Sequence, residues 1–584
     1  MIWRAGPPRG LWCGPARRSW SVPQVRCGGG DDSLKTEIPE PRQVASRATH
    51  SYLSTVLRRG SVPMPPADFV ANWSDAPRDG KFYPRSISID LATMPDHLPP
   101  PDAARLSSLG GLLRLVYGRL SRRLSVTAND DVGRMQRYPS ARWSRGTASG
   151  GSLYPNSMYW VSSGNDGCIA GVYYYSPGTH SLVRLSVGPA AERMGRLLNQ
   201  EDSSIPTAGY LVVGPKLWRS AFKYGAFSYH VTTLDHGAIL ASIDRLTGKT
   251  LQVSRRSFTF DEEAVAHLLG IDPEAEPLLS VTSLEYADLR RKHDVDPPCE
   301  RSAAPGYLTA RVHVHDHEWS QRTISFDTVR AMQREMVDSN RPATEAVTCA
   351  PARTSEVVLT DAERRRTISA LTKRRSAFGR VGWKAIPRST LEGMLESLAG
   401  PPQAQESRMA DESTRTPLEW YVAVINVAET PQGFYRWTPH GLQLISAQDP
   451  TDFLQRNYFL PNYNMANLAF VLVPCVDYGR AISEQGSVMY RVANAAIGRA
   501  TQEFYLAAAH ANLAAGAALG FNNVEYRKVF GLEGHQEDET ADPTVRPGMW
   551  PVIILMAGSE SAELARYRYD LYTKGMVHTW ARAL

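Results

Sequence analysis

The sequence has few cysteines, and they show no pairing pattern. The six lie far apart in a chain of 584 residues, without any Cys-x-x-Cys spacing. Closely spaced cysteines are typical of small disulfide-rich secreted domains, so this pattern favours free thiols in a reducing compartment. We therefore expect a cytoplasmic protein.

Long apolar runs are also missing. The most apolar stretch, residues 501–519, is interrupted by Gln502, Glu503, His510 and Asn512. We interpret it as a helix buried between protein layers rather than a membrane span.

The body of the chain lacks an excess of positive charge. The net charge is +6, but five arginines precede the first acidic residue, Asp31. Without them the net charge falls to about +1, which argues against nucleic-acid binding. The segment before Asp31 also lacks the apolar run of a secretory signal. A transit peptide is one interpretation of this segment. We predict instead that residues 1–48 are a disordered extension, or that the assigned translation start lies upstream of the true one.

Five segments recur in order at an offset of about 260 residues, which indicates an internal repeat. The pairs are 158–161 with 420–424, 171–177 with 433–439, 210–213 with 469–473, 228–231 with 488–492, and 268–272 with 529–533. Each copy combines helices with apolar strands and an aromatic hairpin, so we predict an α+β fold with a mainly antiparallel sheet in each of two tandem domains. We assign residues 49–105 to a segment that wraps a sheet edge, 106–296 to copy one, 297–361 to a linker and 362–584 to copy two.

A glycine-rich turn in copy one is the first candidate for a binding site. Ser149, Gly150 and Gly151 lie just before an apolar strand. Adjacent glycines let backbone N–H groups approach a ligand closely, and the serine adds a hydroxyl group. Such a turn suits a phosphate or the polar edge of a flat cofactor, although a plain connecting turn would look the same.

A basic cluster opens copy two. Arg374, Arg375 and Ser376 follow a predicted helix, and Arg380 lies four residues after Ser376. Guanidinium groups beside a hydroxyl group are suited to a phosphate monoester, but a solvated helix end is an equally simple interpretation. The turn belongs to one copy and the cluster to the other, so we predict one shared site between the copies.

At this point the sequence resembles the FMN-dependent nitroreductase superfamily, and within it the azoline dehydrogenases that oxidise thiazolines and oxazolines in ribosomal peptides. The resemblance runs from about residue 106 to the C-terminus. The residues that carry it are Ser149-Gly150-Gly151, Leu153-Tyr154-Pro155, Lys223-Tyr224-Gly225, Arg374-Arg375-Ser376, and Gly498, Gln502, Leu506 and Gly520.

The resemblance implies an intramolecular pseudo-dimer with one intact FMN site. Arg374 and Ser376 would hold the phosphate with help from Arg380, and the Ser149 turn would meet the flavin. Two positions depart from the family pattern: Ala148 stands where a proline is usual, and Phe378 where a basic residue is usual.

Lys223 and Tyr224 are, by the same resemblance, the candidate catalytic base pair. An azoline has an acidic C–H beside its C=N bond, and a lysine can remove that proton only while it is neutral. A surface lysine beside a half-buried tyrosine is the alternative interpretation of the two residues.

The implied function is FMN-dependent oxidation of azolines in a precursor peptide, with cyclodehydratase proteins as partners. An NAD(P)H-dependent nitroreductase or flavin reductase, and a flavin-free scaffold for a peptide-modifying complex, stay open as alternatives. The alternating run from His313 to His317 is typical of a metal-binding strand, but it lacks an obvious fourth ligand, and we predict no metal site there.

Overall fold

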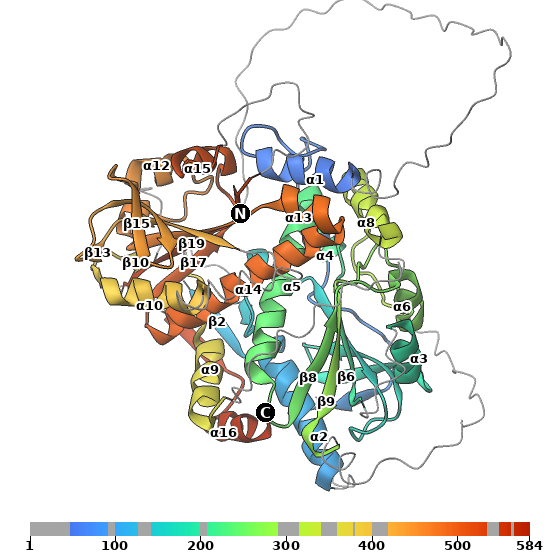
Figure 1. The fold of residues 1–584 in the computed structure, drawn as a ribbon. Coiled ribbons are helices and arrows are strands. Elements are labelled where there is room, and N and C mark those ends of the chain that lie inside the picture. Colours follow the sequence, from blue (N-terminus) through green and yellow to red (C-terminus); the bar gives the residue numbers. More distant parts are fainter. Residues whose placement is uncertain are drawn as a thin grey trace, which may run out of the picture. The chain divides into compact units, whose positions relative to one another are not determined.

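Two antiparallel sheets carry most strands of the described part of the chain, and helices flank them (Figure 1). The computed structural model describes residues 47–91, 100–125, 142–198, 207–289, 315–339, 359–377, 380–399, 418–533, 548–561 and 566–584. All of these residues belong to one compact unit. The predicted α+β class with mainly antiparallel sheet is confirmed.

The first sheet has seven described strands in the order β1-β6-β5-β4-β7-β9-β8, and each neighbouring pair is antiparallel. Its strands are β1 (Ser88–Asp90), β4 (Asn156–Ser162), β5 (Gly171–Ser176), β6 (Ser181–Val187), β7 (Gly209–Pro215), β8 (Leu251–Ser257) and β9 (Ser280–Tyr286). The central strands β4 and β7 are buried along their whole length. Strand β1 comes from the segment predicted to wrap an edge, and it pairs with β6 at the edge of the sheet.

The second sheet has eight described strands, with the main order β10-β19-β16-β12-β14-β15, while β17 pairs with β19 and β18 with β16. Its strands are β10 (Val381–Gly382), β12 (Glu419–Val424), β14 (Gly433–Thr438), β15 (Gly441–Ser446), β16 (Phe470–Val476), β17 (Ala514–Ala518), β18 (Trp550–Pro551) and β19 (Ile554–Glu560). The second sheet repeats the strand order of the first. Its strands β15-β14-β12-β16-β19-β17 take, in order, the places of β6-β5-β4-β7-β9-β8.

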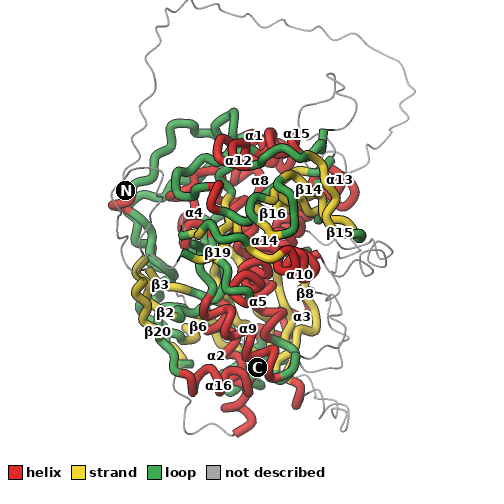
Figure 2. Tube along the Cα trace, turned by 90° about the vertical axis from the view of Figure 1, so that its left-hand side faces the viewer, coloured by secondary structure: helices red, strands yellow, loops and turns green. Residues whose placement is uncertain are grey.

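Two smaller sheets complete the strand pairing that the structure describes. Strand β11 (Ile386–Pro387) is parallel to β13 (Val427–Ala428). Strands β20 (Arg566–Asp570), β2 (Ser121–Ser125) and β3 (Arg142–Ser144) form an antiparallel ribbon in that order (Figure 2). The ribbon therefore joins the C-terminal part of the chain to the segment that precedes the Ser149 turn.

The helices that pack around the sheets range from short turns to one of 23 residues. They are α1 (Arg47–Arg58), α2 (Pro100–Val116), α3 (Ala190–Leu197), α4 (Trp218–Tyr224), α5 (Ser228–Leu246), α6 (Glu262–Leu269), α8 (Asp327–Ser339), α9 (Asp361–Lys373), α10 (Arg388–Ala399), α12 (Thr451–Arg456), α13 (Tyr478–Gln485), α14 (Val488–His510), α15 (Asn523–Val529) and α16 (Lys574–Ala583).

Helices α5 and α14 pack against each other and are buried over most of their surface (Figure 1). A Cβ atom at Gly237 would overlap the backbone of Ala495, and one at Gly498 would overlap the backbone of Leu234. Glycine is therefore required at both positions, because only it allows the two helices to approach so closely. No helix in the described part of the chain is long and apolar enough to span a bilayer.

The apolar stretch 501–519 is not one helix, so that prediction is wrong. Helix α14 ends at His510, and Asn512 has a φ of +54°. A left-handed residue cannot continue a right-handed helix. Residues 514–518 then form β17, which pairs with β19. The pattern of apolar residues did not separate the end of a buried helix from a buried strand, because both are rich in alanine.

The segment predicted as a linker contains a packed helix. Helix α8 buries Val329, Met332 and Met336, and the carboxylate of its Glu335 accepts a hydrogen bond from the backbone N–H of Thr49 at 3.2 Å. The domain boundaries themselves stay predictions.

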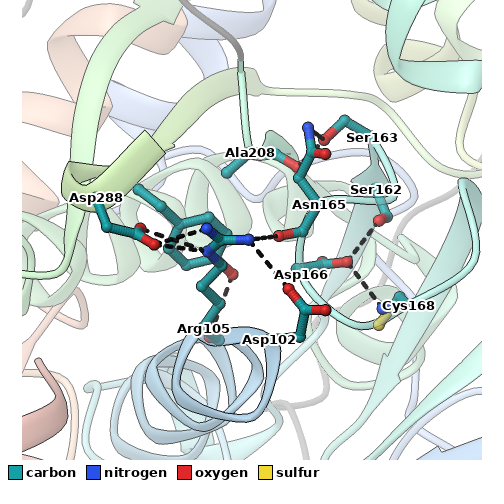
Figure 3. A network of polar contacts seen from close by, with 10 residues as sticks. Asp102, Arg105, Ser162, Ser163, Asn165, Asp166, Cys168, Ala208 and Asp288 are labelled. Atoms are coloured by element: carbon teal, nitrogen blue, oxygen red, sulfur yellow. Dashed lines mark hydrogen bonds and ion pairs between the residues drawn. The ribbon is translucent and has the colours of Figure 1, made fainter. Parts of the chain in front are cut away.

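A partly buried polar network fixes helix α2 to the loop after β4 (Figure 3). The guanidinium group of Arg105 pairs with Asp288 at 2.6 Å and donates to the carbonyl of Asn165 at 2.9 Å. In the same loop, Asp166 accepts hydrogen bonds from Trp160 Nε1 and Ser162 Oγ. The network is structural: Arg105 joins α2 to this loop and to Asp288, which follows β9.

Candidate functional site

The Ser149 turn lies directly against the predicted catalytic pair. Gly151 has a φ of +60°, and a Cβ atom on it would lie 2.5 Å from both Lys223 Nζ and Tyr224 Oη. A Cβ atom on Gly150 would overlap the side chain of Val231 on α5. Both glycines are therefore needed for close packing, and the structure brings three of the predicted elements together: the turn, Lys223 and Tyr224.

Helix α4 presents Lys223 and Tyr224 at its last turn. The helix ends at Tyr224, and the next residue, Gly225, has a φ of +55°, which favours glycine. Lys223 Nζ lies 4.8 Å from the centre of the Tyr224 ring, and both side chains are half-buried. The preceding Phe222 packs edge-on against Trp73 at 5.1 Å, which anchors the helix from its outer side.

Asp235 on α5, a residue that the sequence analysis did not identify, accepts two hydrogen bonds from the turn. Its Oδ2 atom accepts a hydrogen bond from Ser149 Oγ at 2.6 Å, and its Oδ1 atom accepts one from the N–H of Gly150 at 2.8 Å. Burial raises the pKa of the Asp235 carboxyl to about 7, although both hydrogen bonds lower it. The signal available in the sequence was an acidic residue in the middle of a largely apolar helix.

Arg374 from the second half of the chain reaches the backbone just before the turn. Its Nε atom donates to the carbonyl of Gly146 at 2.9 Å, and its Nη2 atom donates to the carbonyl of Arg145 at 3.0 Å. Gln502 on α14 accepts from the N–H of Ala148 at 2.9 Å and donates to Gly146 at 3.1 Å. The predicted groups of the two halves therefore meet at residues 145–148.

Ser376 and Arg374 converge on one tyrosine of α14. Ser376 Oγ is hydrogen-bonded to Tyr505 Oη at 2.8 Å, and the guanidinium carbon of Arg374 lies 5.4 Å from the centre of the same ring. Arg380 is buried, and its Nε atom donates to the carbonyl of Ala377 at 3.0 Å. The backbone between them, at residues 378–379, lies outside the described residues.

The cluster carries an excess of positive charge. Arg123 on β2, also missed by sequence reasoning, donates to the carbonyls of Arg374 and Thr372 at 2.7 Å each. Burial and the nearby charges of Arg374, Arg568 and Arg375 lower the pKa of Arg123 to about 9. Among the described residues no ion pair is recorded for Arg123 or Arg374, whereas Arg375 pairs with Glu560. Such a set favours an anionic ligand.

This donor set fits FMN, which combines a phosphate monoester with a flat, polar-edged ring. Arg374 and Ser376 would hold the phosphate, because they combine a guanidinium group without a carboxylate partner and a hydroxyl group beside it. The turn at Gly151, with Lys223 and Tyr224 beside it, would meet the ring.

Of the run from His313 to His317, the structure describes residues 315–317. Asp316 forms an ion pair with Lys216 at 2.6 Å and accepts from the N–H of Phe82 at 2.8 Å. His313 and Val314 lie outside the described residues. In the predicted alignment of the two copies, residues 411–417 take the place of the Ser149 turn, and they also lie outside the described residues.

Comparison with known proteins identifies the fold. Residues 372–539 match the model of the nitroreductase family. A crystal structure assigned as a nitroreductase from Anabaena variabilis has a TM-score of 0.63 and 20% sequence identity, and it covers 88% of this chain and 99% of that chain. At this identity the likeness shows the fold alone, which is therefore nitroreductase-like over most of the chain.

A weaker likeness extends to the E. coli microcin synthetase McbBCD complex with truncated pro-MccB17 bound. It has 16% identity and a TM-score of 0.24, over 37% of this chain and 78% of that chain. A likeness at this level supports no argument about function. No curated protein matches the chain.

Proposed function

We propose that the protein is an FMN-dependent oxidoreductase that converts thiazoline and oxazoline rings of a peptide into thiazoles and oxazoles. The observation that carries this proposal is the approach of Lys223 Nζ and Tyr224 Oη to Gly151, in a turn that directly follows the backbone contacted by Arg374, at Arg145 and Gly146. An acid–base pair and an anion site in one locality are what such an oxidation needs.

The chain's own residues would perform the proton transfer. The neutral amine of Lys223 takes the proton from the ring carbon beside the C=N bond, and Tyr224 Oη donates or relays that proton onward. FMN, when bound, supplies the hydride acceptor. The ring loses two hydrogen atoms and becomes aromatic, and dioxygen is the proposed final electron acceptor.

We further propose that the site is shared between two tandem copies of one fold. The equal strand order of the two large sheets supports this, as does the close packing of α5 against α14. Ser149, Gly150 and Gly151 come from the first copy, and Arg374, Ser376 and Arg380 come from the second. The proposed partners are an azoline-containing precursor peptide and the cyclodehydratase proteins that would form its rings.

Two measurements on the purified protein test the proposal. A flavin absorption spectrum that survives gel filtration supports FMN binding. Mass spectrometry of a heterocyclised peptide should then show a loss of 2 Da per oxidised ring without added NAD(P)H, because each oxidation removes two hydrogen atoms. An unchanged peptide mass with the flavin-loaded protein would contradict azoline oxidation.

An NAD(P)H-dependent nitroreductase or flavin reductase is the second candidate, because residues 372–539 match the nitroreductase family model. Oxidation of NAD(P)H with a nitroaromatic substrate, together with an unchanged azoline peptide, would favour it. A colourless protein that binds no FMN but retains the peptide would favour the flavin-free scaffold.

A further inference from the structure

The hydroxyl group of Ser149 has only one hydrogen, and Asp235 takes it in this structure. Ser149 Oγ lies 2.6 Å from Asp235 Oδ2, and it also accepts a hydrogen bond from the N–H of Tyr154 at 2.9 Å. When Asp235 is ionised, the serine hydroxyl can therefore only accept a hydrogen bond from a ligand at the turn and cannot donate one. The resemblance to the nitroreductase superfamily predicts that the Ser149 turn meets the flavin.

Protonation of Asp235 would reverse this arrangement without moving the backbone. The carboxyl hydrogen on Oδ2 would then be donated to Ser149 Oγ, so the serine's own hydrogen could turn towards a ligand. Oδ1 would keep accepting the N–H of Gly150, at 2.8 Å in this structure. The hydrogen bonds between Asp235 and the turn are kept in both states, and in the protonated state the serine hydrogen is left for the ligand to accept.

We infer that Asp235 is a positioning residue whose protonation state decides whether Ser149 presents a hydrogen or a lone pair to the flavin. This inference rests on the proposed function, because it needs a flavin at the turn. The carbonyl oxygens and N5 of an oxidised flavin accept hydrogen bonds, so the protonated state of Asp235 is the one that binds the flavin more tightly.

The surroundings of Asp235 allow it to change charge near neutral pH. Asp235 is buried in the middle of α5, and its two recorded hydrogen bonds are to neutral groups of the turn. The titratable groups around the turn are Tyr117 on α2 and Lys223 and Tyr224 on α4. Burial raises the pKa of Tyr117 well above its ordinary value, although the charges of Arg145 and Arg219 lower it. Tyr117 therefore stays neutral while Asp235 titrates.

Asp244, one aspartate further along α5, provides a matched control. Burial raises its pKa, but ion pairs with Arg256 and Arg499 outweigh this and lower it to about 2. It therefore stays ionised where Asp235 titrates, although both carboxylates lie on one helix.

The test is a titration of full-length, flavin-free protein with FMN at pH 6 and pH 8, followed by flavin fluorescence. For the wild type we expect the Kd to rise about three- to tenfold from pH 6 to pH 8. This change corresponds to the free energy of about one hydrogen bond. Asp235→Asn should stay at the tight value, because its amide donates to Ser149 at every pH. Ser149→Ala should stay at the weak value, and Asp244→Asn should follow the wild type. The titration of the FMN phosphate is common to all four proteins and cancels in their Kd ratios.

The outcomes separate this inference from the proposed function. Absence of FMN binding at either pH in the wild type would overturn both. FMN binding with the same pH dependence in the wild type, Asp235→Asn and Ser149→Ala would overturn the positioning role alone. If Asp235→Asn does not fold, the Ser149→Ala comparison still decides, because it removes the hydroxyl group and leaves the carboxylate.

Discussion

Asp235→Asn should change how the stability of the protein depends on pH, even without any ligand. The carboxyl group of Asp235 has a pKa of about 7 in the folded chain, against 3.8 for the ordinary group, because it is buried. A shift of about 3 units corresponds to about 4 kcal/mol, since one unit is worth about 1.36 kcal/mol.

The sign follows from proton binding. Between about pH 4 and pH 7 the folded chain keeps a proton on Asp235 that the unfolded chain has released. The stability that this proton contributes is present below pH 4 and is lost as the pH rises through 7. From pH 5 to pH 7 the loss is about 2 to 3 kcal/mol at about 1.36 kcal/mol per unit. An asparagine does not titrate, so the variant lacks this loss.

Buried histidines contribute in the opposite direction. Burial lowers the pKa values of His230 and His236, so their contribution to stability is present above pH 6.5 and is lost as the pH falls. Both histidines are unchanged in the variant, so their contributions cancel in the difference between variant and wild type.

Thermal unfolding of wild type and variant at pH 5 and pH 7.5 measures this difference. With an unfolding entropy of about 2.1 cal/mol/K per residue, 2 to 3 kcal/mol corresponds to about 2 °C in the apparent Tm of this chain. We expect the variant to gain about 2 °C relative to the wild type between the two pH values. The Tm difference between Asp244→Asn and the wild type should be the same at both pH values. If the Tm difference between Asp235→Asn and the wild type is the same at both pH values, the reasoning is refuted.

Three further substitutions test the site. Lys223→Ala should keep the flavin spectrum and lower the rate of ring oxidation about 10²- to 10⁴-fold, the usual contribution of a general base. Lys249→Ala, at an exposed lysine, should behave like the wild type. Full activity in Lys223→Ala would remove this residue from the mechanism. Gly151→Ala should lower kcat by displacing the catalytic pair, and should cost about 1–2 kcal/mol of stability for its left-handed backbone; an unchanged kcat would argue against contact at the turn. Arg374→Ala should weaken FMN binding about 10- to 100-fold, while Arg480→Ala, which removes an exposed ion pair, should not; equal affinities would remove Arg374 from the phosphate site.

Local patterns predicted much of this architecture. The constant offset between apolar segments indicated two similar strand sets, and the two large sheets have the same strand order. The basic cluster was predicted to follow a helix, and α9 ends at Lys373, immediately before it. These features depend on short stretches of sequence, where periodicity and end signals act over a few residues.

Contacts between distant residues could not be predicted in the same way. Asp235 lies 86 positions from Ser149, and Arg123 lies 251 positions from Arg374. No local pattern reports such pairings, because they exist only once the sheets and helices have packed. The change from helix α14 to strand β17 was missed for a related reason, since β17 is set by its pairing with β19.

The most direct test of the shared site is the stoichiometry of FMN binding to the full-length chain. Equilibrium titration of the wild type should give one FMN per chain, and single substitutions in either half, Gly151→Ala or Arg374→Ala, should each weaken that one site. Two independent FMN sites per chain, or a single site that only one of these substitutions affects, would contradict a site built jointly by the two halves.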